Sequence, residues 1–126
     1  MLILVAVATI IDKEIVMSKT ITREQITDKL NKQEPMTIVE ALPQKYFDAE
    51  HLPGAVNIPH DEIRLKASNM LPDKDAFIVV YCASTECQNS KLATNTLQQM
   101  GYTNAFEYVE GKQHWLAANL PVETTD

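Results

Sequence analysis

The two cysteines of the chain, Cys82 and Cys87, follow an apolar run at residues 77–80 that reads Phe-Ile-Val-Val. Such a run predicts a buried strand. In open parallel sheets, ligands bind beyond the carboxyl ends of the strands, so Cys82 lies where a fold of this kind performs chemistry. A cysteine thiolate is a strong nucleophile. We therefore predict that Cys82 is the catalytic residue.

The segment after Cys82 is composed of small and polar residues, and we predict that it forms a substrate-binding loop. Its members are Ala83, Ser84, Thr85, Glu86, Cys87, Gln88 and Asn89. A loop of this type can direct its backbone N–H groups toward one point, and a helix beginning near Ser90 adds the positive end of its dipole. An anionic sulfur on Cys82 would then be stabilised without a charged side chain. Inert buried cysteine is common, so the pattern alone leaves that alternative open.

Cys87 has two interpretations. Its five-residue offset from Cys82 could return its sulfur to Cys82, where it would resolve a persulfide or an oxidised thiol as an internal disulfide. Alternatively, Cys87 packs between helix and sheet as a structural thiol. The spacing does not decide between them.

Short strands and helices alternate along the chain. Strands are predicted at residues 37–41, 55–58, 76–81 and 105–109. A Thr22–Gln25 capping box predicts a helix from Arg23, and further helices are predicted at residues 44–50, 61–70, 90–100 and 111–118. This order indicates an α/β domain with a small, mainly parallel central sheet flanked by helices.

Periodicity also names candidate core residues on two of these helices. In the helix at residues 61–70 they are Ile63, Leu65 and Met70, and in the helix at residues 90–100 they include Leu92 and Leu97.

Composition narrows the class of protein. The 126 residues include 11 basic and 17 acidic side chains, a formal net charge of −6, and no basic cluster. This balance argues against a nucleic-acid or anionic-membrane partner. Two cysteines are too few for a disulfide-rich secreted scaffold, so we expect a cytoplasmic protein.

The N-terminal residues 1–16 are treated separately from a single domain at residues 17–126. Residues 1–11 are apolar but shorter than the roughly 20 residues that span a bilayer. We expect either an extra strand or a start-site artefact.

No metal and no cofactor are predicted. His51, His60 and His114 are scattered, and the two cysteines lack the tighter spacing of a structural zinc site. We expect His51 to support the Pro53-Gly54 turn structurally, together with Gly54.

Several motifs occur together in order. They are HLPGAVNIP at residues 51–59, IVVYCAS at 78–84, GY at 101–102, EGKQHW at 110–115 and LPVE at 120–123. With them, residues 37–123 resemble a single-domain rhodanese. Residues 51–55 fit the HxPGA signature, Cys82 falls on the sulfur-carrying cysteine, and Gly111 and Trp115 fit the GGxxxW segment, with Glu110 replacing its first glycine.

The resemblance implies a rhodanese-like fold and a sulfurtransferase activity. The Cys82 thiolate would take the outer sulfur of thiosulfate or a persulfide donor. It would hold this sulfur as a persulfide and pass it to cyanide, a small thiol or a protein thiol. The expected partners are therefore a small sulfur donor and a thiol or protein acceptor.

Departures from the family pattern leave other functions open. The arginine that many members carry near the loop end is absent, and the DVR-type segment reads Glu40-Ala41-Leu42, so Lys91 is the nearest expected cation. Thiosulfate binding should be weakened, and phosphatase activity is not expected. The alternatives are a thiol-redox module built on Cys82 and Cys87, or a non-catalytic binding domain.

Overall fold

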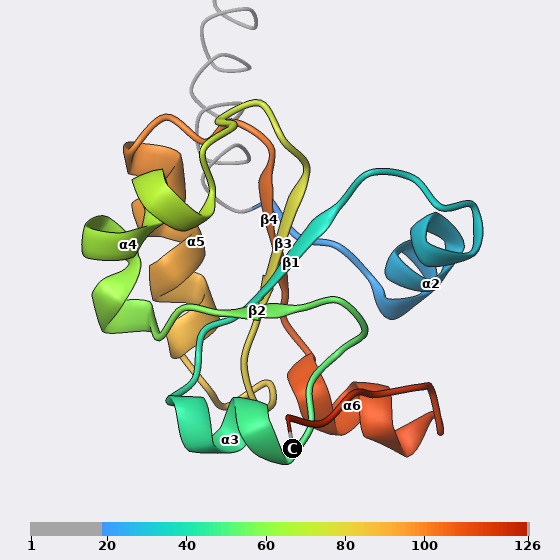
Figure 1. The fold of residues 1–126 in the computed structure, drawn as a ribbon. Helices are drawn as coiled ribbons and strands as arrows, with labels where there is room; N and C mark the ends of the chain where they lie inside the picture. Colours follow the sequence, from blue (N-terminus) through green and yellow to red (C-terminus); the bar gives the residue numbers. More distant parts are fainter. Residues whose placement is uncertain (1–18, 126) are drawn as a thin grey trace, which may run out of the picture.

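The computed structural model describes residues 19–125, so the expectation for residues 1–16 lies outside the described residues. Four parallel strands form one sheet in the order β2-β1-β3-β4. They are β1 (Thr37–Glu40), β2 (Val56–Asn57), β3 (Ile78–Tyr81) and β4 (Ala105–Tyr108). Helices flank this sheet, and the predicted α/β class is confirmed (Figure 1).

Two helical layers cover the sheet. On one face lie α4 (Ile63–Met70) and α5 (Asn89–Gln99), and on the other lie α2 (Arg23–Asn31) and α6 (Gly111–Ala117) (Figure 1). The short helix α3 (Gln44–Ala49) follows β1 near the carboxyl ends of the strands. The predicted capping box at the start of α2 is confirmed, because the Thr22 hydroxyl and the Gln25 side chain each bind the other residue's backbone N–H.

Several predicted boundaries were wrong by one or two residues. Strand β2 is two residues long, because the preceding chain is held in a turn by the Ala55 N–H bond to Leu52 O. The helix expected over residues 61–70 begins as a 3₁₀ turn at His60–Glu62 before α4. Helix α5 starts at Asn89, one residue earlier than predicted.

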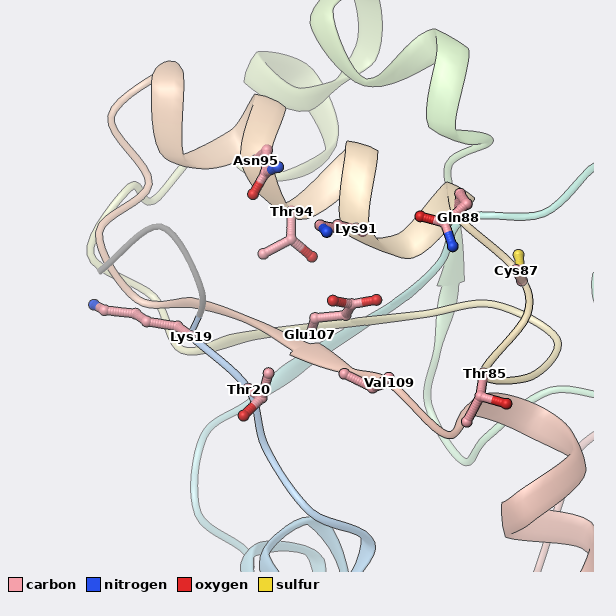
Figure 2. A pocket seen from close by; sticks show the side chains of 10 residues that line it. All are labelled: Lys19, Thr20, Thr85, Cys87, Gln88, Lys91, Thr94, Asn95, Glu107 and Val109. Atoms are coloured by element: carbon pink, nitrogen blue, oxygen red, sulfur yellow. The ribbon is translucent and has the colours of Figure 1, made fainter. Parts of the chain in front are cut away.

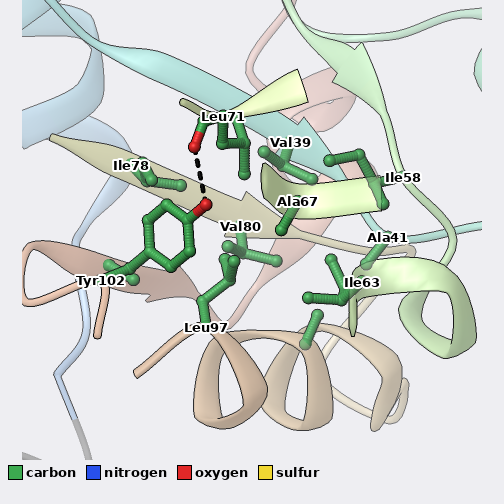
Figure 3. Packing of buried hydrophobic residues seen from close by; sticks show 12 residues of the cluster. Val39, Ala41, Ile58, Ile63, Ala67, Leu71, Ile78, Val80, Leu97 and Tyr102 are labelled. Carbon is green, nitrogen blue, oxygen red and sulfur yellow. Dashed lines mark hydrogen bonds between the residues drawn. The ribbon is translucent and has the colours of Figure 1, made fainter. Parts of the chain in front are cut away.

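The core between the sheet and the α4–α5 layer is built from aliphatic side chains. Ile63, Ala67 and Leu97 from the helices pack against the sheet, and the buried Tyr102 hydroxyl donates to Leu71 O at 2.6 Å (Figure 3). The i, i+4 spacing of Ile63 and Ala67 defines the inner face of α4.

Three predicted core residues are exposed. Leu65 is 82% exposed because it lies two positions from Ile63, on the far side of α4. Met70 and Leu92 are 40% and 51% exposed, while Ala93 and Leu97 supply the inner face of α5. Their inclusion in the core was wrong.

The central strand β3 positions the candidate site. All four of its residues are buried, as expected for a strand with parallel neighbours on both sides and a helical layer on each face. The strand ends directly before Cys82. Among the described helices, none has both the length and the apolar character needed to span a membrane.

Candidate active site

Cys82 lies beneath the first turn of α5. Its side chain is buried, and its Sγ accepts a hydrogen bond from the Ser90 N–H at 3.3 Å. The Ser90 hydroxyl lies 3.2 Å from the same sulfur and donates to a Glu107 carboxylate oxygen at 2.8 Å. The sulfur therefore has a helix N-terminal amide as its donor, an arrangement that favours thiolate.

The loop between β3 and α5 retains unused backbone donors. Cys87 N–H donates to Ser84 O at 3.0 Å and closes a turn. Among the described residues, no hydrogen bond is formed by the N–H groups of Ser84, Thr85 or Gln88. These amides are available to an anionic ligand. Asn89, which was predicted to belong to the loop, lies in the first turn of α5.

Cys87 bonds to Cys82 in this structure. The two residues form a disulfide across Cα atoms 6.3 Å apart, a separation usual for such bonds. Cys87 is partly exposed, so the alternative of a structural thiol between helix and sheet was wrong. Its role as a resolving cysteine stays a prediction.

The start of α6 fixes the first residues of the loop. Lys112 N–H donates to Cys82 O at 2.8 Å, and Gln113 N–H donates to Ala83 O at 2.9 Å. Gly111 allows this approach, because its φ is +73° and a Cβ there would lie 2.6 Å from Cys82 O. A residue with a side chain therefore cannot occupy position 111 without moving the loop.

Substituting Gly111 with alanine is expected to displace the loop and slow the reaction of Cys82 at least tenfold, since small misplacements in a site cost about a hundredfold. The rate of Cys82 alkylation in the reduced protein measures this effect. Gly54→Ala is the matched control, because Gly54 has the same φ but no atom within 4 Å of its Cβ position. Equal rates in the two variants would contradict the assigned role of Gly111.

His51 and Gly54 lie on the turn before β2, outside the loop. His51 stacks on Phe47, with ring centroids 3.8 Å apart, and its Nδ1 lies 2.8 Å from Phe47 O. Its backbone pairs with Glu123, whose carboxylate accepts the Gly54 N–H at 2.9 Å. A hydrogen bond connects this turn to the end of β3: the Leu52 N–H donates to the Tyr81 hydroxyl at 3.1 Å.

A buried cluster of Glu40, Tyr81 and Lys112 supports the loop from below. Glu40 and Tyr81 are register partners on β1 and β3, and the Tyr81 hydroxyl donates to Glu40 Oε1 at 2.6 Å. Lys112 Nζ donates to Glu40 Oε2 at 3.0 Å and to Tyr46 O at 2.8 Å. Burial raises the pKa of Glu40 and of Tyr81 above their ordinary values.

The contacts of Ser90, Glu107, Glu40 and Lys112 were not predicted from the sequence. Lys91 was expected to be the nearest cation, whereas Lys112 is a buried cation whose backbone binds Cys82. One signal was present: Glu40 and Glu107 stand in short apolar strands, where a lone carboxylate requires a partner. Which residues pair with these two carboxylates depends on the strand register and on where the helices pack.

Two hollows flank the loop. The first, of about 320 Å³, lies on the Cys87 side between α5 and β4 (Figure 2). It is lined by Lys19, Thr20, Thr85, Cys87, Gln88, Lys91, Thr94, Asn95, Glu107 and Val109. The second, of about 260 Å³, lies on the α6 side and includes Tyr46, Ala83 and Leu116.

Comparison with known proteins identifies a family match over most of the chain. The family described as rhodanese-like domain matches residues 22–118. The HTH-type transcriptional regulator Rv0324 of Mycobacterium tuberculosis is 31% identical over 88 residues, which are 70% of this chain and 38% of that protein. The thiosulfate sulfurtransferase PspE of Escherichia coli is 36% identical over 63 residues, which are 50% of this chain and 58% of PspE. The chain thus spans only about half the length of such relatives.

Solved structures share the fold. The BH2092 protein from Bacillus halodurans has a TM-score of 0.79 at 23% identity, covering 95% of this chain and 85% of that chain. The human single-domain sulfurtransferase TSTD1 has a TM-score of 0.70 at 21% identity, covering 79% and 96% respectively. At these identities the comparison concerns the fold alone.

Proposed function

Because the chain belongs to the rhodanese-like domain family, we propose that it is a sulfurtransferase in which Cys82 carries a sulfane sulfur as a persulfide. Membership confirms the resemblance found in the motifs. The observation that carries the proposal is the Cys82 sulfur at the end of β3, 3.3 Å from the first-turn amide of α5. Family members include sulfurtransferases such as PspE, whose name states thiosulfate as its substrate.

The proposed reaction has two displacements. The Cys82 thiolate attacks the outer sulfur of thiosulfate or a persulfide, and sulfite or a thiolate leaves with the bonding electron pair. The resulting Cys82 persulfide anion is held by Ser90 N–H and by the unused loop amides, which act as an oxyanion hole does. A thiolate or cyanide then attacks the outer sulfur and regenerates the Cys82 thiolate. The loop works in its dithiol form, which suits a reducing cytoplasm.

The charge of the site bears on the donor. The loop contains the Glu86 carboxylate. The Lys112 ammonium lies in the buried cluster with Glu40, which neutralises it. No arginine lies in the loop. Within the loop itself, a dianionic donor therefore meets backbone N–H groups and the Glu86 carboxylate, which repels it, but no cationic side chain.

We expect a persulfide of small charge to load Cys82 about tenfold or more faster than thiosulfate does. The hydrogen bond from a loop arginine to an anionic donor, which this chain lacks, would contribute a free energy that corresponds to about tenfold or more. Loading rates at equal donor concentration and moderate salt measure this preference. A thiosulfate rate equal to or above the persulfide rate would contradict it.

Mass spectrometry tests the proposal directly. The protein is reduced, freed of reductant, and incubated separately with thiosulfate and with a cysteine persulfide. The proposal requires a mass gain of one sulfur atom that maps to the peptide containing Cys82 and disappears on adding cyanide. No gain with either donor, or a gain elsewhere, would overturn it.

A second function is favoured by the Cys82–Cys87 disulfide. The Cys87 thiolate can attack the inner sulfur of the Cys82 persulfide, releasing hydrosulfide and leaving the disulfide. The electrons balance without an external oxidant, because the persulfide is itself reduced. In this thiol-redox scheme, the disulfide is an obligatory state of each cycle.

A further inference from the structure

The two sulfurs of the disulfide differ in accessibility. Cys82 is 1% exposed and lies beneath α5, whereas Cys87 is partly exposed and lines the 320 Å³ hollow. Figure 2 shows Cys87 and Gln88 on one side of this hollow and the Glu107 carboxylate facing it from β4. An incoming thiol that enters here meets Cys87 first.

We propose that this hollow binds a small zwitterionic thiol, one carrying both carboxylate and ammonium groups, which opens the disulfide by attacking Cys87. The proposal deepens the second function above and rests on the disulfide, not on sulfur loading. The incoming thiolate bonds to Cys87 Sγ, the Cys82–Cys87 bond breaks, and Cys82 departs as a thiolate. A second molecule of the same thiol then releases Cys87 as a thiolate and leaves as the symmetrical disulfide.

The surroundings of Cys82 favour its departure. In thiol–disulfide exchange, the sulfur with the lower thiol pKa is the better leaving group. Cys82 Sγ accepts the Ser90 N–H at the positive end of α5, an eleven-residue helix. No described residue donates a hydrogen bond to Cys87 Sγ. The same contacts that stabilise a Cys82 thiolate for sulfur transfer therefore direct reduction toward Cys87.

The lining of the hollow matches a thiol with two opposite charges. Lys91 forms no ion pair with any described residue and supplies the cation for a carboxylate. Glu107 offers a carboxylate for an ammonium group: its Oε2 accepts the Ser90 hydroxyl at 2.8 Å, and no group within residues 19–125 hydrogen-bonds to its Oε1. Gln88 and Asn95 add polar side chains to the lining. The volume of about 320 Å³ is at the small end of ligand sites.

Trapping the mixed disulfide tests which sulfur is attacked. The full chain is oxidised, and peptide mapping establishes the Cys82–Cys87 link. Limiting glutathione is then added, and free thiols are blocked with N-ethylmaleimide. We expect glutathione on Cys87 and N-ethylmaleimide on Cys82. Glutathione mainly on Cys82, equal labelling of both, or no internal link after oxidation would overturn the proposal.

Removing the charge of Lys91 tests whether the hollow recognises a charged thiol. Reduction rates are measured with glutathione and with uncharged 2-mercaptoethanol, and their ratio should fall about threefold to fivefold in Lys91→Ala, as expected for one exposed ion pair. Lys32→Ala is the matched control, since Lys32 pairs with Asp28 on α2, away from the hollow. An unchanged ratio in Lys91→Ala would overturn the proposal that Lys91 binds the carboxylate of the thiol. Sulfur loading is measured separately on reduced protein, so its failure is distinguishable from failure here.

Discussion

Replacing Cys82 with serine is expected to abolish sulfur loading from every donor while leaving the fold intact. Serine is similar in size, and its hydroxyl can accept the Ser90 N–H that the sulfur accepts now. It cannot ionise near neutral pH and so provides no comparable nucleophile. Intact-mass measurement after incubation with a persulfide donor gives the readout, and thermal unfolding gives the control for folding. Loading at the wild-type level would refute the role of Cys82.

The Cys87→Ser variant distinguishes a sulfurtransferase from the thiol-redox scheme, which the Cys82→Ser variant cannot do. A sulfurtransferase that needs only Cys82 keeps full loading and full transfer to cyanide in Cys87→Ser. The thiol-redox scheme instead predicts that the variant still loads sulfur but no longer releases hydrosulfide by itself, since the disulfide cannot form. A binding domain without chemistry gains no sulfur in either variant or in the wild type. Hydrosulfide release at the wild-type rate from Cys87→Ser would exclude the redox scheme.

The position of Cys82 at a strand end, and the loop after it, could be predicted because both depend on local sequence. A buried apolar strand followed by Cys82 and a run of small polar residues already implies a strand end and a turn. The same reasoning placed the parallel sheet, since strands and helices alternate at short intervals. These features need no knowledge of which segments meet in space.

The contacts that support the loop could not be predicted, because each joins residues far apart in sequence. Glu40 meets Tyr81 only because β1 and β3 pair in that register, and Lys112 completes the cluster from α6. Glu107 meets Ser90 because strand alternation turns it toward α5. Leu65 and Leu92 were misplaced for a related reason: an apolar side chain on a short helix does not show which face packs on the sheet.

Lys112→Met is expected to lower the free energy of unfolding by about 3–5 kcal/mol, the usual effect of removing one partner from a buried ion pair. Glu40 is fully buried and Lys112 is nearly so. Among the described residues, the variant leaves the Glu40 carboxylate with the Tyr81 hydroxyl as its one hydrogen-bond donor. The free energy of unfolding of a domain of this size totals about 5–15 kcal/mol, so the loss is a large share of it. Urea unfolding measures it.

The pH dependence of that loss identifies its cause. Burial raises the pKa of Glu40 above its ordinary value of 4.5, and removing the ammonium raises it further. A carboxyl with a raised folded-state pKa contributes its stability below its unfolded-state pKa and loses it as pH rises through the folded-state pKa. Lys112→Met should therefore be least destabilising near pH 4.5 and progressively more so at higher pH.

The double variant Glu40→Gln with Lys112→Met supplies the control for this prediction. Glutamine retains the volume of Glu40 and an oxygen that accepts the Tyr81 hydroxyl, but it carries no charge to be left unpaired. Replacing both partners of a buried pair is commonly close to neutral, so the double variant should recover most of the stability and lose the added pH dependence. If the double variant is as unstable as Lys112→Met at every pH, the loss arises from packing around residue 112, and the ion pair is not its source.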